Sequence, residues 1–195
     1  MLPSIEEAQR ELELRLEKGR PVNEAGRLEK EIKAYNLLDR IGISFERIDH
    51  EPLYTMEACD VVAGILNASI CKNLFLCNTQ KTQFYMLLLP GDKKFKTKVV
   101  SKLLGVARLS FGDEEHMEGL LDLTPGSVTI LGLMNDTERK VKLIIDKDVM
   151  DAEYFACHPC INTSSIRFKM EDLVNKLIPA LGHEPVYLDY EPEEE

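Results

Sequence analysis

The clearest structural signal in this chain is KNLFLCNTQKTQFYMLLL, residues 72–89. Two apolar runs, 73–77 and 84–89, lie on either side of the polar segment 78–83. Short apolar runs bounded by turn-forming residues are typical of buried strands, and a polar segment of this length suits a hairpin. The sequence therefore predicts two antiparallel strands in the middle of the chain.

Further strands and short helices are expected on both sides of this hairpin. The expected strands are 44–49, 107–111, 127–131 and 142–146, with another inside 148–168. The expected helices are 4–18, 23–41, 98–104, 113–121 and 170–181, with one more beginning near Glu57. Hairpins interrupt any regular alternation of strand and helix, so we expect an α+β fold with a mixed, largely antiparallel sheet flanked by helices.

The length of 195 residues favours one domain with appendages. Residues 1–22 read as an N-terminal helical extension and 23–183 as the body of the protein. Residues 184–195 contain acidic side chains and no basic ones, so we expect a partly solvated acidic tail.

Composition excludes several classes of protein. Lys and Arg total 24 against 34 Asp and Glu, a net charge of −10, which argues against a general nucleic-acid coat or a DNA-binding protein. No apolar stretch is long enough to cross a membrane, and the N-terminus lacks the apolar core of a signal peptide. Five cysteines, an odd number, favour reduced thiols, and we expect a cytoplasmic location.

The bases are concentrated in residues 92–108, which carry six bases and one acid. The segment is either a solvated loop and helix face or a surface that contacts RNA phosphates. The lysines expected to make such contacts are Lys93, Lys94, Lys96, Lys98 and Lys102.

Three shorter features stay ambiguous on the residues alone. Cys157-His158-Pro159-Cys160 could be a thiol redox pair or half of a zinc site. Lys72 at the head of a strand could be merely exposed, and His50 could lie in an ordinary loop. No P-loop, dinucleotide fingerprint or G-x-S-x-G element is present.

Taken in order, however, several pieces resemble a known family. They are Asp49-His50-Glu51-Pro52 with Thr55, Lys72-Asn73-Leu74-Phe75-Leu76, Leu89-Pro90-Gly91-Asp92-Lys93, Leu123–Thr129, Gly132–Asp136, and His158-Pro159 with Asn162-Thr163. This set is similar to the YbaK/prolyl-tRNA synthetase-associated editing domain family, and is closest to its free-standing ProX-type alanyl-tRNA(Pro) deacylases. The resemblance covers about residues 32–181.

The resemblance implies a partly closed mixed sheet and a trans-editing reaction. Prolyl-tRNA synthetase mischarges its tRNA with alanine, and these proteins hydrolyse the wrong ester by water attack. A second pocket is needed because a pocket built for a larger side chain excludes a smaller one only weakly. The missing methylenes change the binding free energy by only about 1–3 kcal/mol. The expected partners are mischarged tRNA(Pro) and prolyl-tRNA synthetase. No cofactor or metal is expected.

The family's functional positions fall on six residues here. Lys72 would hold the terminal adenosine phosphate or the aminoacyl end by charge, and His158 would position the ester or the water. The substrate-binding residues would be Asn73, Gly132, Asn162 and Thr163. Cys157 and Cys160 depart from the family pattern, which leaves open whether alanine, cysteine or serine is removed. Alternatives are a noncatalytic amino-acid or tRNA sensor with the same pocket and a thiol redox protein.

Overall fold

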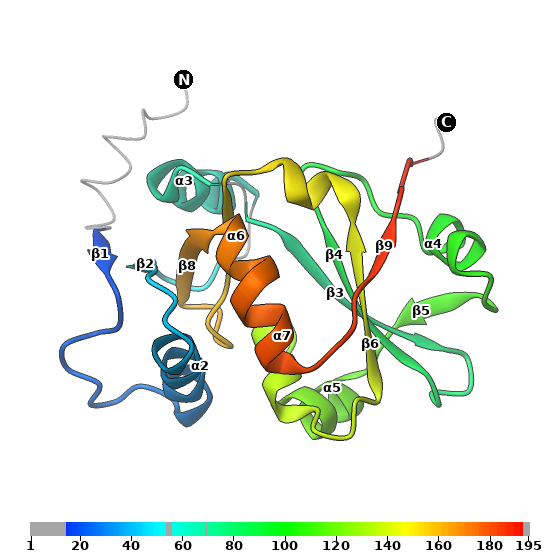
Figure 1. Cartoon of the computed structure of the whole chain (residues 1–195), viewed down its shortest axis with the longest axis horizontal. Coiled ribbons are helices and arrows are strands. Elements are labelled where there is room, and N and C mark those ends of the chain that lie inside the picture. Colours follow the sequence, from blue (N-terminus) through cyan, green and yellow to red (C-terminus); the bar gives the residue numbers. More distant parts are fainter. Residues whose placement is uncertain (1–14, 54–55, 69, 193–195) are drawn as a thin grey trace.

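The structure is a computed structural model that describes residues 15–53, 56–68 and 70–192. Its strands form two sheets, with β1, β2 and β8 on the left in Figure 1 and the larger sheet on the right. The larger sheet has the order β5 (Leu109–Phe111), β3 (Lys72–Asn78), β4 (Phe84–Leu89), β6 (Val141–Asp146) and β9 (Val186–Leu188). The smaller has the order β1 (Leu16–Lys18), β2 (Glu46–Asp49), β8 (Ser164–Lys169) and β7 (Tyr154–Cys157).

The predicted hairpin and the mixed α+β fold are confirmed. β3 pairs antiparallel with β4, with Lys72 opposite Leu89 and Cys77 opposite Phe84. β4, β6 and β9 are parallel to one another, which makes the larger sheet mixed. A single parallel bridge between Ile70 and Ala156 joins the two sheets, so they partly enclose one core.

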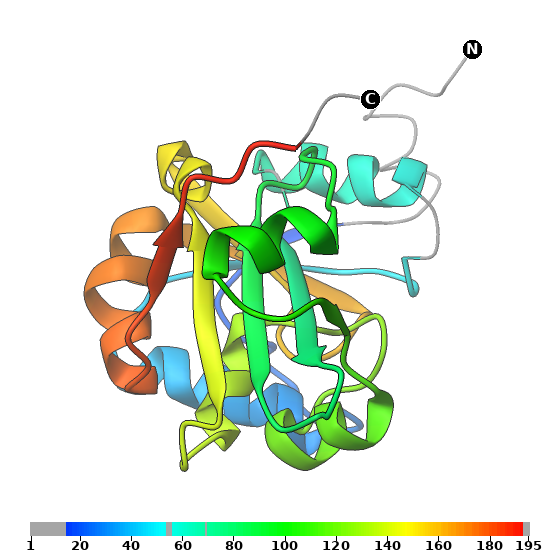
Figure 2. The same ribbon diagram turned by 90° about the vertical axis from the view of Figure 1, so that its right-hand side faces the viewer.

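Helices flank the sheets and connect the strands. They are α2 (Glu29–Arg40), α3 (Met56–Leu66), α4 (Thr97–Leu104), α5 (Glu114–Leu121), α6 (Met170–Asp172) and α7 (Ile178–Leu181), with a π-helical turn at Leu173–Leu177 and 3-10 helices at Ile130–Asn135 and Lys147–Asp151. Asp113 caps α5 as expected, with its side chain accepting from the amide of His116 at 2.9 Å. Figure 2 shows α4 lying across β3 and β4.

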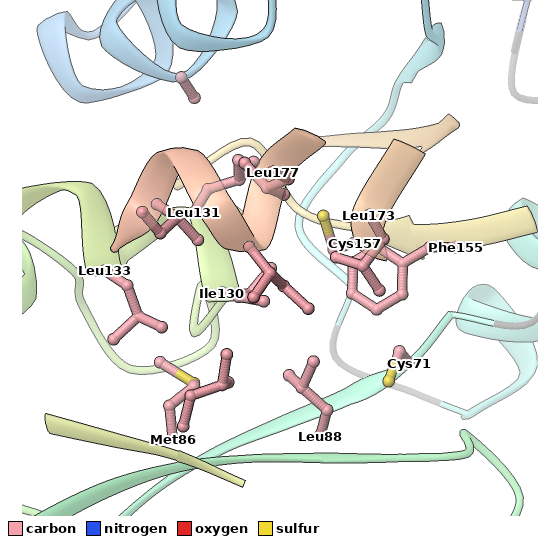
Figure 3. Packing of buried hydrophobic residues seen from close by; sticks show 14 of the residues in the cluster. Cys71, Met86, Leu88, Ile130, Leu131, Leu133, Phe155, Cys157, Leu173 and Leu177 are labelled. Carbon is pink, nitrogen blue, oxygen red and sulfur yellow. The ribbon is translucent and has the colours of Figure 1, made fainter. Parts of the chain in front are cut away.

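The continuous apolar run of β4 follows from burial on both faces of its sheet. Phe84, Met86 and Leu88 face the main core, while the alternate residues face α4 and β9. Figure 3 shows Met86 and Leu88 pointing toward Leu131 and its neighbours, below the helix that carries Leu173 and Leu177. A central strand buried on both faces has no polar face to present.

Three expected elements differ from the structure. Residues 16–18 form strand β1 and not the end of a helix, because they pair with β2; the rest of that expected helix lies outside the described residues. Helix α2 begins at Glu29, six residues after the expected start at Asn23. Of the strand expected at 127–131, residues 127–129 have no regular structure and the remainder begins a 3-10 helix, whose first amide, that of Ile130, donates to Asn73 Oδ1.

The acidic C-terminal segment is partly solvated, as expected, and it also forms a strand. β9 pairs in parallel with β6, while Leu188 and Tyr190 are buried. Separately, none of the helices in the described ranges is both long and apolar enough to span a bilayer.

Candidate active site

The start of β3 is the point at which three segments distant in sequence meet. The amide of Cys71 donates to the carbonyl of Ala156 at 3.1 Å, which ties β3 to β7. Asn73 donates from Nδ2 to the Cys71 carbonyl at 2.9 Å and accepts from the Ile130 amide at 2.8 Å. Asn73 therefore caps the 3-10 helix that contains Gly132, and β7 leads directly into His158.

Lys72 lies at this junction as a half-buried cation. Its Nζ donates to the backbone carbonyl of Lys93 at 2.7 Å. None of the carboxylates in the described ranges forms an ion pair with Lys72. A carbonyl is neutral, so the ammonium keeps its full charge and two further donors for an anionic or developing negative group.

His158 belongs to a chain of hydrogen bonds that ends at His50. His158 Nδ1 lies 2.8 Å from the Ser164 carbonyl oxygen and 3.3 Å from Ser165 Oγ. Ser165 Oγ lies 2.9 Å from His50 Nε2, and His50 Nδ1 lies 2.8 Å from the Glu51 carbonyl. A carbonyl only accepts, so both histidines carry hydrogen on Nδ1. The Ser165 hydroxyl therefore donates to His50 Nε2, and His158 Nε2 is left as a bare acceptor.

Both imidazoles are neutral at pH 7. Burial lowers the pKa of His158, and the neighbouring His50 lowers it further, against the effect of the bond to the Ser164 carbonyl. Burial also lowers the pKa of His50, although the Glu51 carbonyl and the nearby carboxylates oppose it. A neutral His158 with a free Nε2 can accept a proton from water.

Two cavities open beside the segment around Asp49 and His50, and His158 lines neither of them. One of about 380 Å³ is lined by His50, Glu51 and Pro52 together with Leu53, Ala58 and Val62. A second of about 290 Å³ is lined by Thr163, Ile161, Arg27 and neighbouring residues. Asp49 borders both cavities, and although burial acts to raise its pKa, hydrogen bonds from Arg27 and Arg47 hold that pKa at about 2.

The remaining expected site residues lie on the loop between β7 and β8 and in the 3-10 helix. Thr163 is exposed, and its carbonyl accepts from the His50 amide at 3.0 Å. Asn162 is half-buried beside the turn at Gly126. Gly132 is buried, and a Cβ there would lie 2.5 Å from the Leu123 side chain. The absence of a side chain at Gly132 thus accommodates Leu123, and its expected role in substrate binding stays a prediction.

Sequence reasoning missed the roles of Ser165 and His50. No serine is among the site residues expected from the sequence, yet Ser165 is hydrogen-bonded to His50. The Ser165 side chain is fully buried between two imidazoles, which separates it from any ester outside. Only the isolated His50 in a polar segment gave a hint of this arrangement.

The basic segment 92–108 is less uniform than its composition indicated. Lys93 is not an exposed base, because its Nζ forms ion pairs of 2.7 Å with the buried Asp146 and with Asp148. Lys96 is half-buried. Lys94, Lys98, Lys102 and Arg108 are exposed.

Removing the Lys93 ammonium should destabilise the fold. Lys93→Met leaves the carboxylate of Asp146 buried without its partner, and we expect a loss of about 3 kcal/mol in the free energy of unfolding. Lys94→Met, at the exposed neighbour, should change it by less than about 0.5 kcal/mol. Urea denaturation of both variants measures this, and equal stabilities would mean that the Lys93 ion pairs contribute little.

The cysteines are poorly suited to redox or zinc chemistry. Burial raises the pKa of Cys157 to about 12 and that of Cys160 still higher. Both thiols are therefore protonated at neutral pH, whereas redox attack needs the thiolate. No cluster of three or more potential metal-ligating side chains occurs within the described residues.

Comparisons with known proteins agree with this geometry. Residues 50–176 match the family model of the aminoacyl-tRNA editing domain. The prolyl-tRNA editing protein ProX of Acetoanaerobium sticklandii is 33% identical over 147 residues, which cover 75% of this chain and 88% of that protein. Prolyl-tRNA synthetase associated domain-containing protein 1 of Danio rerio is 27% identical over 166 residues, covering 84% and 88%.

The fold is also that of a solved relative. A structure described as a candidate trans-editing enzyme for prolyl tRNA synthetase superimposes with a TM-score of 0.60 at 14% identity, covering 84% of this chain and 99% of that one. The match to more than half of the chain and the identity to ProX together define the family. The chain therefore belongs to the aminoacyl-tRNA editing domain family and, as such, is an aminoacyl-tRNA deacylase.

Proposed function

We propose that this protein is a trans-editing enzyme that hydrolyses alanyl-tRNA(Pro) and spares prolyl-tRNA(Pro). The observation that carries the proposal is the junction at the start of β3, where the residues on either side of Lys72 bond the strand that leads into His158 and the 3-10 helix that contains Gly132. The similarity to a protein named as a prolyl-tRNA editing protein supports tRNA(Pro) as the carrier.

In the proposed mechanism, water attacks the ester carbonyl. His158 Nε2, held as a bare acceptor, orients the water and accepts its proton. Negative charge then develops on the carbonyl oxygen, where a fixed donor lowers the barrier. The Lys72 ammonium supplies that donor or, alternatively, holds the terminal adenosine phosphate. The ester bond then breaks, the proton held by His158 passes to the leaving ribose oxygen, and the amino acid and the free tRNA leave.

The identity of the amino acid is tested by a panel of esters on one tRNA. We expect alanyl-tRNA(Pro) to be hydrolysed faster than the seryl and cysteinyl esters, because a small pocket built for a methyl group makes no hydrogen bond to a hydroxyl or thiol. Faster hydrolysis of the cysteinyl ester would assign the enzyme to cysteine instead. Binding of all esters without hydrolysis would indicate a sensor.

Ser165→Ala distinguishes water attack from an acyl-enzyme. We expect this variant to keep activity within about tenfold of wild type, because the Ser164 carbonyl still holds His158 Nδ1. Loss of a true nucleophile would cost far more, on the order of 10⁶-fold. Ser101→Ala, which also removes a buried hydroxyl, is the matched control, and single-turnover deacylation is the measurement. A near-total loss in Ser165→Ala alone would contradict water attack.

A further inference from the structure

The C-terminal segment is bonded to the loop between β4 and α4 through one side chain. Tyr190 is fully buried. Its hydroxyl donates to the Lys94 carbonyl at 2.9 Å and accepts from the Lys96 amide at 2.8 Å. Burial raises the pKa of Tyr190, so the phenol keeps the proton that it donates. The two bonds fasten the loop at the residues around Lys94 and Lys96.

Lys93, which precedes Lys94, also contacts Tyr190 and its neighbours. Its Nζ forms ion pairs with Asp146 and Asp148 and lies 5.6 Å from the centre of the Tyr190 ring. The Tyr190 amide in turn donates to the second carboxylate oxygen of Asp146 at 3.4 Å. The Lys93 side chain is thus held by Asp146 of β6, and the backbone that follows Lys93 is held by Tyr190 of the C-terminal segment.

The backbone carbonyl of Lys93 is the group that accepts from Lys72 Nζ at 2.7 Å. We propose that Tyr190 is a positioning residue that fixes the Lys72 ammonium by way of the loop 93–96. The role of Lys72 in deacylation on which this rests is that of the proposed function. Tyr190 lies beyond residues 50–176, so the inference concerns a segment that the family match does not include.

A lysine needs such a support more than most side chains do. Its four-carbon stem is flexible, and ordering it costs conformational entropy. Without the phenol hydroxyl, the Lys94 carbonyl and the Lys96 amide lose their partners, and the loop must shift to find others. The Lys93 carbonyl would move with the loop. A displacement of about 1 Å at a reacting group can cost up to about 10²-fold in rate.

The test compares Tyr190→Phe with Tyr187→Phe, which removes an exposed hydroxyl from the same C-terminal segment. The first readout is acylation of lysine amines by a succinimidyl ester in the tRNA-free protein, mapped by mass spectrometry. We expect the Tyr190 variant to label Lys72 several-fold faster than wild type, with Lys142 as the internal reference. The second readout is deacylation of alanyl-tRNA(Pro), where we expect a fall in kcat of about tenfold.

A third variant serves as a control for a folding defect. Asp148→Asn alters a half-exposed partner of Lys93 and should raise Lys72 labelling less than Tyr190→Phe does. Lys72 labelling that is unchanged in Tyr190→Phe and in Asp148→Asn would overturn the inference. Increased labelling in a protein whose Lys72→Ala variant remains fully active would support the positioning and contradict only the catalytic role of Lys72.

Discussion

Replacing Lys72 with alanine is expected to lower kcat/KM for alanyl-tRNA(Pro) by about 10²–10³-fold. The half-buried Lys72 ammonium forms a 2.7 Å bond to the neutral carbonyl of Lys93, which leaves its charge available to a substrate. A half-buried lysine bonded only to a carbonyl contributes modestly to folding, so the variant should remain folded. Steady-state deacylation together with circular dichroism measures both effects.

Lys142→Ala is the matched control, because it removes an exposed lysine from β6, another strand of the same sheet. Its activity should equal that of wild type. A minimal alanyl-adenosine ester without the phosphate then separates the two roles open to Lys72. If the lysine stabilises the carbonyl oxygen, the loss persists on the minimal ester; if it holds the phosphate, the loss disappears. Full activity of Lys72→Ala on both substrates would exclude either role.

Reversing two exposed charges of the basic segment should weaken tRNA use steeply. We expect Lys94→Glu with Lys102→Glu to lower kcat/KM on full-length tRNA by more than about tenfold, and to reduce the salt slope of binding by about two. The protein as a whole carries −10, so phosphate contacts depend on this local excess of bases. Hydrolysis of the minimal alanyl ester should be unchanged.

The control for this pair is Lys140→Glu with Lys169→Glu, which changes the net charge equally. Lys140 precedes Val141, which pairs with Phe84 at the end of the larger sheet remote from Lys72 and Leu89. An equal loss in both double variants would mean that overall charge, and not the segment 92–108, governs the encounter. An equal loss on tRNA and minimal ester would mean that the segment supports only the pocket.

The strands and helices that could be predicted are those with a strong local signal. The hairpin 72–89 was predictable because two apolar runs enclose a polar turn, and α5 because Asp113 is a good helix cap. The 3-10 helix at Ile130–Asn135 was not, because a short apolar run fits a strand equally well. Its first amide, that of Ile130, donates a hydrogen bond to Asn73, 57 residues away in sequence.

The site residues show the same limit. Lys72 and His158 were predicted from a resemblance and stay predictions, while their hydrogen-bond partners depend on contacts that no local pattern shows. Ser165 meets His50 across 115 residues because β2 and β8 are adjacent. The sequence indicated that Lys93 was an exposed base. In the folded protein, Lys93 forms an ion pair with Asp146 of β6. A count of charged residues along the sequence does not predict an ion pair that forms only in the folded protein.

The central claim is tested most directly by one measurement, the release of amino acid from alanyl-tRNA(Pro) and prolyl-tRNA(Pro) at equal concentration by the purified protein. If the editing pocket admits alanine and excludes the larger proline ring, the alanyl ester is lost rapidly while the prolyl ester decays at its uncatalysed rate. Equal rates for the two esters, or no enzyme-dependent hydrolysis of either, would contradict the account.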